Sequence, residues 1–182
     1  MPIFYWLVLC YDFFMADPIP VYYSWMGTPL GKLLLAATYR GLRYVRLDGS
    51  LPPKKKTEVW IEFAGALRPY EEQLQAYFRG DLREFTCQLD LVGTEFQKKC
   101  WRALMEIPYG KTCSYAEQAL RVGSPKAFRA VGQANHRNPI PIIVPCHRVI
   151  ASTGTLGGYG GGLSAKERLL AIEGLSGFSR DH

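Results

Sequence analysis

The residues with the clearest chemical potential are a cysteine and a histidine that adjoin each other, Cys146 and His147, followed by Arg148. A thiol becomes a strong nucleophile where a nearby cation or base favours its thiolate. The β-branched run 142–144 before them predicts a short buried strand, which Pro145 cannot continue. We therefore expect Cys146 at a strand end, either as an activated nucleophile or as a buried cysteine beside a surface His-Arg pair.

A carboxylate that could orient this histidine lies 26 residues further along the chain, at Glu173. A capping box over 164–167 predicts the start of a helix, and Gly174 predicts its end. Glu173 then falls in the last turn, where the helix dipole disfavours a carboxylate without a partner. A Cys-His-Glu relay, in which His147 acts on Cys146 directly or through water, would provide that partner. A frayed, solvated Glu173 is the alternative.

Composition sets limits on the class of protein. With 182 residues and 48% hydrophobic content, the chain can bury a core as one domain or two small ones. Its five cysteines are odd in number and form no C-x-x-C pair, which argues against a disulfide framework and against a zinc site. We expect a reducing compartment and no metal site.

The net charge is confined to the second half of the chain. Residues 94–182 carry 12 Lys and Arg against six Asp and Glu, whereas residues 1–93 carry ten of each kind. A basic half beside a neutral one favours a polyanionic partner, although an excess of this size also occurs on solvated surfaces.

The first half of the chain has a strand pattern that follows an apolar extension. Residues 1–15 are too short to span a membrane, and they could form an extra strand, a weak anchor or an upstream extension of the reading frame, with Met15 as the start. Alternating patterns within 20–48 predict a three-stranded meander. A helix ending near Arg79 and a strand over 85–91 complete this half, and we place a domain boundary after Val92.

The second half has readable helix caps. Capping boxes at 94–97 and 114–117 predict the starts of two helices. A third helix is expected over 126–135, with Ser124 as its N-cap and Pro125 at its first position. A helix, a tight glycine-containing turn and a second helix form a helix-turn-helix, a motif that either enters a DNA groove or only packs.

These motifs together carry a family resemblance. The sequence Pro145-Cys146-His147-Arg148-Val149, preceded by Asn138-Pro139 and by 129–132, resembles the O6-alkylguanine-DNA alkyltransferase family, also called methylated-DNA-protein-cysteine methyltransferases. The resemblance extends from about residue 28 to 174 and is poorest over 57–66.

The resemblance implies an α+β fold, with a small ribonuclease H-like α/β domain over 20–92 and a winged-helix-like domain with the helix-turn-helix over 93–182. Residues 1–19 form an extension of unknown role, and its first 15 residues have no recognised counterpart in the family. It also implies the stoichiometric, single-turnover transfer of an alkyl group from O6-alkylguanine, and from O4-alkylthymine, in DNA to Cys146. The lesion base would be flipped into a pocket, and no cofactor would take part.

Site residues follow from the same resemblance. Cys146 would be the nucleophile, His147 its base through a water, Glu173 the orienter of His147, Asn138 the support of the turn, and Tyr115 the proton donor to the departing guanine. DNA contacts are expected from Ser114, Lys126, Ala127, Arg129, Ala130 and Arg137, with Arg129 filling the gap left by the flipped base. Tyr159 and the backbone around Val149 and Gly160 would line the base pocket.

The partner expected from this interpretation is double-stranded DNA that contains alkylated bases. We expect the protein to bind it as a monomer and not to associate with a membrane. The expected location is the cytoplasm, or the nucleus if the source is eukaryotic. Two other classes stay open. A non-catalytic lesion-binding protein would keep the DNA-binding half but not need Cys146, and a Cys-His-Glu hydrolase would not need a basic helix-turn-helix.

Overall fold

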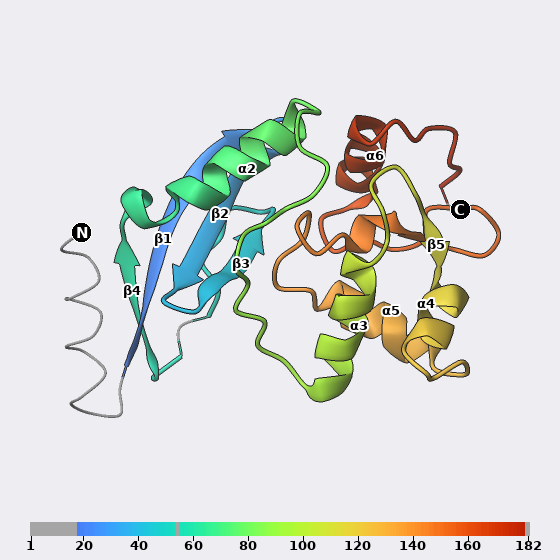
Figure 1. Ribbon diagram of the computed structural model, residues 1–182, viewed down its shortest axis with the longest axis horizontal. Helices are drawn as coiled ribbons and strands as arrows, with labels where there is room; N and C mark the ends of the chain where they lie inside the picture. The colour runs from blue at the N-terminus through green and yellow to red at the C-terminus, as the bar shows by residue number, and fades with distance from the viewer. Residues whose placement is uncertain (1–17, 54, 181–182) are drawn as a thin grey trace.

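The computed structural model describes residues 18–53 and 55–180, so the expectations for residues 1–15 lie outside the described residues. The first half forms a four-stranded sheet in the order β3-β2-β1-β4 (Figure 1). Its antiparallel meander of β1, β2 and β3 confirms the predicted one, whereas β4, which pairs parallel to β1, was not predicted. The strands are β1 (Ile19–Thr28), β2 (Gly31–Thr38), β3 (Gly41–Arg46) and β4 (Glu58–Glu62).

Helix α2 (Arg68–Phe78) crosses one face of this sheet, as Figure 1 shows, and buries Leu74 and Tyr77. It ends where predicted, before Gly80, which has a positive φ of 81°. The strand predicted over 85–91 is wrong. This segment passes the sheet with a single bridge between Leu89 and Leu42 and then continues towards the next helix.

The second half is mostly helical, and its first two helices begin at the predicted caps. Thr94 and Ser114 each accept a hydrogen bond from the backbone three residues on, and both capping boxes are complete. The elements are α3 (Glu95–Met105), β5 (Cys113–Ser114), α4 (Tyr115–Arg121), α5 (Phe128–His136), the 3-10 helix η2 (Cys146–Arg148), β6 (Val149–Ile150) and α6 (Leu163–Ile172).

Two predicted helix starts are wrong. Helix α5 begins at Phe128, because Ser124 accepts a hydrogen bond from the Ala127 backbone at 2.8 Å and closes a turn there instead of capping a helix. Helix α6 begins at Leu163, and its N-cap is Gly162, whose φ of 84° favours glycine; the expected capping box at Ser164 does not form. Lys126 and Ala127 therefore precede α5, and Arg129 lies in its first turn.

The two halves share one hydrophobic core. The largest cluster of buried side chains combines Leu33, Leu35 and Tyr77 of the first half with Trp101 and Leu169 of the second. Because a shared core fixes the position of one half relative to the other, residues from both halves can contribute to a single site.

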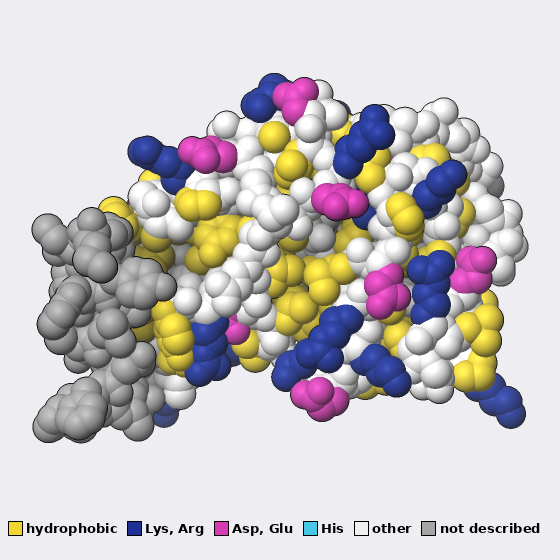
Figure 2. Space-filling view, in the orientation of Figure 1, with side chains coloured by type: hydrophobic (Ala, Val, Ile, Leu, Met, Phe, Trp, Pro, Cys, Tyr) yellow, Lys and Arg dark blue, Asp and Glu magenta, His cyan; other side chains and the backbone are white. Residues whose placement is uncertain are grey.

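The face of the molecule drawn in Figure 2 does not by itself mark a binding surface. On the face drawn in Figure 2, Lys and Arg side chains lie mixed with Asp and Glu over both halves. Among the described residues, no helix has the length and apolar character needed to cross a membrane. A site has to be located from specific side chains.

Candidate functional site

Cys146 is presented by a compact turn, and the strand predicted over 142–144 is wrong. The amide of Asn138 donates to the Val144 carbonyl at 2.7 Å and to the Cys146 sulfur at 3.1 Å, while its oxygen accepts from the Ile140 backbone at 3.0 Å. Ile142 has a φ of 77°, a left-handed conformation that is costly for a β-branched residue. Its fully buried side chain and the Asn138 bonds hold the turn in place.

The environment of Cys146 keeps its resting thiol protonated. Cys146 opens η2 and is 8% exposed. Burial raises the pKa of the thiol, against the opposing effects of the Asn138 hydrogen bond and the Lys166 charge. A group that removes the proton is therefore needed before the sulfur can attack an electrophile.

His147 is placed to be that group. It is fully buried, which excludes the alternative of a surface His-Arg pair. Its Nε2 lies 2.8 Å from Glu173 Oε1, so Nε2 carries the proton it donates, and Nδ1 is left as the basic nitrogen. Nδ1 is buried without a hydrogen-bond partner among the described residues. Burial lowers the pKa of His147, which keeps the ring neutral and able to accept a proton.

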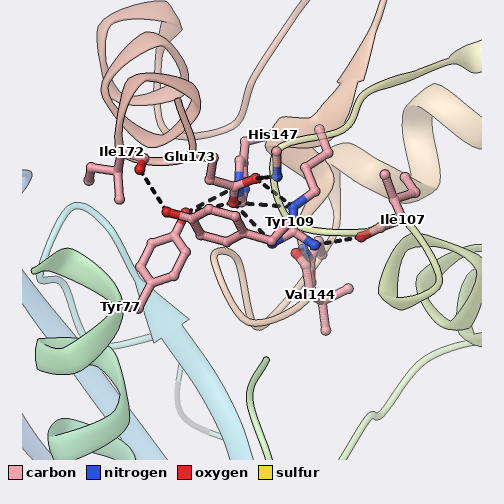
Figure 3. A network of polar contacts seen from close by, with 10 residues as sticks. Tyr77, Ile107, Tyr109, Val144, His147, Ile172 and Glu173 are labelled. Atoms are coloured by element: carbon pink, nitrogen blue, oxygen red, sulfur yellow. Dashed lines mark hydrogen bonds and ion pairs between the residues drawn. The ribbon is translucent and has the colours of Figure 1, made fainter. Parts of the chain in front are cut away.

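Glu173 is the centre of the polar network in Figure 3. Besides His147, its carboxylate accepts from Arg148 Nε at 2.9 Å and from the Gly110 backbone at 3.1 Å. Burial alone would raise the pKa of Glu173, but the hydrogen bonds and charges of His147 and Arg148 outweigh it and lower the pKa to about 2. Glu173 is therefore an ionised, buried group and not a frayed helix end, which excludes the second alternative.

Sequence reasoning missed three buried polar residues that support this network. Arg148 donates from Nη1 to the Ile107 carbonyl at 2.6 Å. Tyr77 donates its hydroxyl to Glu173 Oε1 at 2.8 Å. Lys166 donates to the carbonyls of Val149 and Leu156, which ties β6 to the glycine-rich loop, residues 154–162. Lys166 stands three and four residues before buried leucines of α6, a signal that could have placed it on the apolar face.

A cavity of about 320 Å³ opens at Cys146. Its lining includes the predicted pocket residues Tyr159 and Gly160, and the Tyr159 hydroxyl is buried without a partner among the described residues. Val149, whose surrounding backbone was also predicted to line the pocket, is not among these lining residues: it is fully buried, pairs with Cys113 and gives its carbonyl to Lys166. The remaining lining residues are Val45, Arg46, Leu47, Asp48, Asn135, His136, Asn138, Pro141 and Gly161.

Tyr115 lies beside the glycine-rich loop and not in the cavity lining. Its hydroxyl donates to the Gly158 carbonyl at 3.3 Å. Added Cβ atoms at Gly132 and Gly157 would contact its ring, so the tyrosine occupies the gap between α5 and the loop. The ring of Tyr115 therefore lies next to both the second helix of the helix-turn-helix and the loop that borders the cavity.

The predicted DNA-contact residues fall into two groups. Ser114 is the N-cap of α4, and Ala127 is a half-buried residue of the turn before α5. Lys126, Arg129, Ala130 and Arg137 are exposed. The Arg129 guanidinium lies 5.9 Å from the ring of Phe128, which is 48% exposed. The exposed end of α5 is thus both cationic and aromatic.

Behind this exposed surface, α4 and α5 are joined by a pair of buried amides. Gln118 and Asn135 exchange hydrogen bonds at 3.1 and 2.7 Å, and Gln118 also donates to the Cys100 carbonyl of α3. Since both amides are satisfied, the three helices have a defined packing. Among residues 18–53 and 55–180, no group of three His, Cys, Asp or Glu residues could hold a metal ion.

Comparison with known proteins gives consistent matches over most of the chain. The family described as "6-O-methylguanine DNA methyltransferase, ribonuclease-like domain" matches residues 21–91. The family described as "6-O-methylguanine DNA methyltransferase, DNA binding domain" matches residues 95–175. These two matches also bear out the α+β fold of a ribonuclease-like domain followed by a DNA-binding domain.

Individual relatives agree with the family matches. A methylated-DNA–protein-cysteine methyltransferase of Methanosarcina acetivorans is 52% identical over 85% of this chain and 99% of its own length. The protein of the same name from Mycobacterium leprae is 51% identical over 81% of this chain and 89% of its own. The crystal structure of Mycobacterium tuberculosis OGT in complex with DNA is similar with a TM-score of 0.75 and 46% identity, covering 85% of this chain and 92% of that one.

Proposed function

Because the chain belongs to the methylated-DNA–protein-cysteine methyltransferase family and repairs DNA by direct alkyl transfer to a cysteine, we propose that Cys146 is the acceptor. The observation that carries this proposal is the position of Cys146 in the cavity wall. The next residue in the sequence, His147, is buried and hydrogen-bonded to Glu173. The proposed substrates are O6-alkylguanine and O4-alkylthymine.

The proton of the Cys146 thiol passes through a water molecule to His147 Nδ1, and Glu173 stabilises the imidazolium that forms. The thiolate then attacks the alkyl carbon. A new carbon–sulfur bond forms as the carbon–oxygen bond breaks, and the electron pair of that bond stays on the guanine oxygen. Tyr115 donates a proton to the departing base and recovers one from solvent. The products are unmodified guanine and a thioether.

The thioether explains why the reaction runs once and without a cofactor. The acceptor is a side chain of the protein, and a carbon–sulfur bond of this kind is not readily displaced by water or thiols. The protein is consumed with each lesion. A hydrolase would have to regenerate Cys146, so repeated turnover of an ester would favour that alternative.

Double-stranded DNA with alkylated bases is the proposed partner, bound by one copy of the chain. The support is the helix-turn-helix of α4 and α5, with exposed Lys126, Arg129 and Arg137, and the DNA-bound relative. Base flipping costs a few kcal/mol, and Arg129 would occupy the vacated space. The proposed location is a reducing compartment such as the cytoplasm, or the nucleus in a eukaryote, in keeping with the free thiols of Cys87, Cys100, Cys113 and Cys146.

The experiment that tests the acceptor is mass spectrometry after incubation with duplex DNA that contains O6-methylguanine. We expect the intact protein to gain the mass of one CH2 group, and the gain to fall on the peptide that contains Cys146. Cys146→Ser should bind the same DNA and gain nothing. A methyl group on Cys113, or binding by the wild-type protein without any adduct, would contradict the assignment; the second result would favour the lesion-binding alternative.

A further inference from the structure

Tyr77 connects the first domain to the polar network behind Cys146. It lies on α2, is fully buried, and donates its hydroxyl to Glu173 Oε1 at 2.8 Å. The same hydroxyl oxygen lies 3.4 Å from His147 Nε2. Figure 3 shows Tyr77 reaching from α2 towards the carboxylate of Glu173, which belongs to the second domain.

The contact is made to the atom on which the relay depends. Glu173 Oε1 accepts from both His147 Nε2 and the Tyr77 hydroxyl, each at 2.8 Å. A hydroxyl that donates to a carboxylate limits its rotation, and a hydrogen bond to a charged group is about twice as strong as one between neutral groups. The position of Oε1, and with it the ring orientation of His147, therefore depends on a residue outside the second domain.

The hydroxyl can act only as a donor to this carboxylate. Burial and the neighbouring Glu173 charge raise the pKa of Tyr77 far above its ordinary value, so the proton stays on the tyrosine throughout the working pH range. The ring has a separate, apolar role, since it packs against Phe78, Phe85 and Tyr109. Removing the hydroxyl alone therefore separates the two roles.

We propose that Tyr77 is a positioning residue for alkyl transfer: through its hydrogen bond to Glu173, the ribonuclease-like domain sets the orientation and basicity of His147. This inference rests on the proposed role of His147 as the base. It assigns the first domain a part in the proton transfer itself, in addition to its part in the shared core.

Removal of the donor should change the basicity of His147 in a defined direction. Without the Tyr77 hydroxyl, less of the Glu173 charge is compensated, and the carboxylate attracts a proton on His147 more strongly, which raises the pKa of the imidazole. The charged and titratable groups that act on His147 are Lys166 of α6, its C-cap Glu173, Arg148 of η2, and Tyr77 of α2. Of these, Tyr77→Phe alters only the last.

Tyr77→Phe is the test, with Tyr109→Phe as the matched control. Tyr109 also donates a hydroxyl to the end of α6, at the Ile172 carbonyl 2.7 Å away, and not to the Glu173 carboxylate. Both variants keep the aromatic ring and should fold. We expect Tyr77→Phe to slow transfer about tenfold, equally for free O6-benzylguanine and for duplex DNA, because the relay serves both reactions. The acid limb of its pH-rate profile should move to higher pH.

The ¹H–¹⁵N signal of His147 Nε2–H provides a readout that needs no substrate. It should shift in Tyr77→Phe and stay in place in Tyr109→Phe. The inference is overturned if Tyr77→Phe keeps the wild-type rate, acid limb and Nε2–H signal, or if Tyr109→Phe changes all three to the same extent. A wild-type protein that accepts no alkyl group would contradict the proposed function instead, and the histidine signal would still test the Tyr77 contact.

Discussion

At the scale of single residues, the site is governed by one ionised carboxylate buried among donors. Glu173 faces Arg148, His147, Tyr77 and Gly110, and a buried carboxylate keeps its charge only when it is compensated to this degree. Gly110 can bring its backbone N–H to the carboxylate because its φ of 70° is open to glycine. Placement of this charge behind His147 stabilises the imidazolium at the moment it forms.

The stability of the protein should therefore depend on the ionisation of Glu173. Its pKa is about 2 in the folded protein against an ordinary value of 4.5, so the folded state resists protonation more than the unfolded chain does. The stabilisation is complete above pH 4.5 and is lost as the pH falls towards 2. The shift corresponds to roughly 3 kcal/mol.

Glu173→Gln tests this dependence. At pH 7 we expect the free energy of unfolding of the variant to be roughly 3 to 5 kcal/mol lower than that of the wild type, because Arg148 then lacks its anionic partner. Denaturant titrations at a series of pH values should show the gap to wild type narrowing between pH 4.5 and 2. A gap that is constant over this range would mean that Glu173 is not the ionised group that the network requires.

At the scale of elements, local signals in the sequence predicted the starts of α3 and α4 but not those of α5 and α6, and tertiary effects were not predicted. The capping boxes of α3 and α4 involve neighbouring residues only, and both were predicted. The β-branched run 142–144 favours a strand, but the Asn138 bonds and burial of the run impose a turn instead. The pairing of His147 with Glu173 could be inferred, because the helix dipole requires a partner for a carboxylate at the end of a helix. The hydrogen bonds of Tyr77 and Arg148 to Glu173 could not be inferred, because they depend on tertiary packing.

Helix α5 carries the prediction that belongs to this scale. Arg129 is exposed in its first turn, next to the partly exposed ring of Phe128. If it occupies the space left by a flipped nucleotide, Arg129→Ala should slow repair of duplex DNA by roughly 10-fold or more, while the reaction with free O6-benzylguanine keeps its wild-type rate. Single-turnover rates for the two substrates measure the difference.

Lys126→Ala is the control for charge alone. Lys126 precedes α5 and is exposed, so it should act as a phosphate contact. Its loss should weaken binding to all duplexes and reduce the slope of log affinity against log salt by about one. Equal slowing of both substrates by Arg129→Ala would indicate that Arg129 supports the fold and not the flipped state.

At the scale of the whole molecule, the cavity at Cys146 is built by both domains. The segment after β3 contributes Leu47 to its wall, and the turn that presents the cysteine contributes Cys146. The Val45 backbone of β3 donates to the Pro139 carbonyl at 2.9 Å, which joins the end of this strand to the segment that leads into the turn. The size of the cavity is consequently set by the contact between the domains and not by the second domain alone.

Leu47 should therefore limit which alkyl groups can react. It is half-buried and fills the space beside Gly161, where a Cβ atom would collide with its side chain. We expect a benzyl group, because of its size, to need this space and a methyl group not to need it. We expect Leu47→Ala to raise the rate with O6-benzylguanine by roughly 10-fold relative to the rate with O6-methylguanine in DNA, since discrimination by one or two carbon atoms amounts to about 1–3 kcal/mol.

Leu47→Met, which conserves volume, should leave the ratio unchanged. If both rates fall together in Leu47→Ala while Leu47→Met behaves as wild type, the leucine holds the domains together and does not restrict the alkyl group.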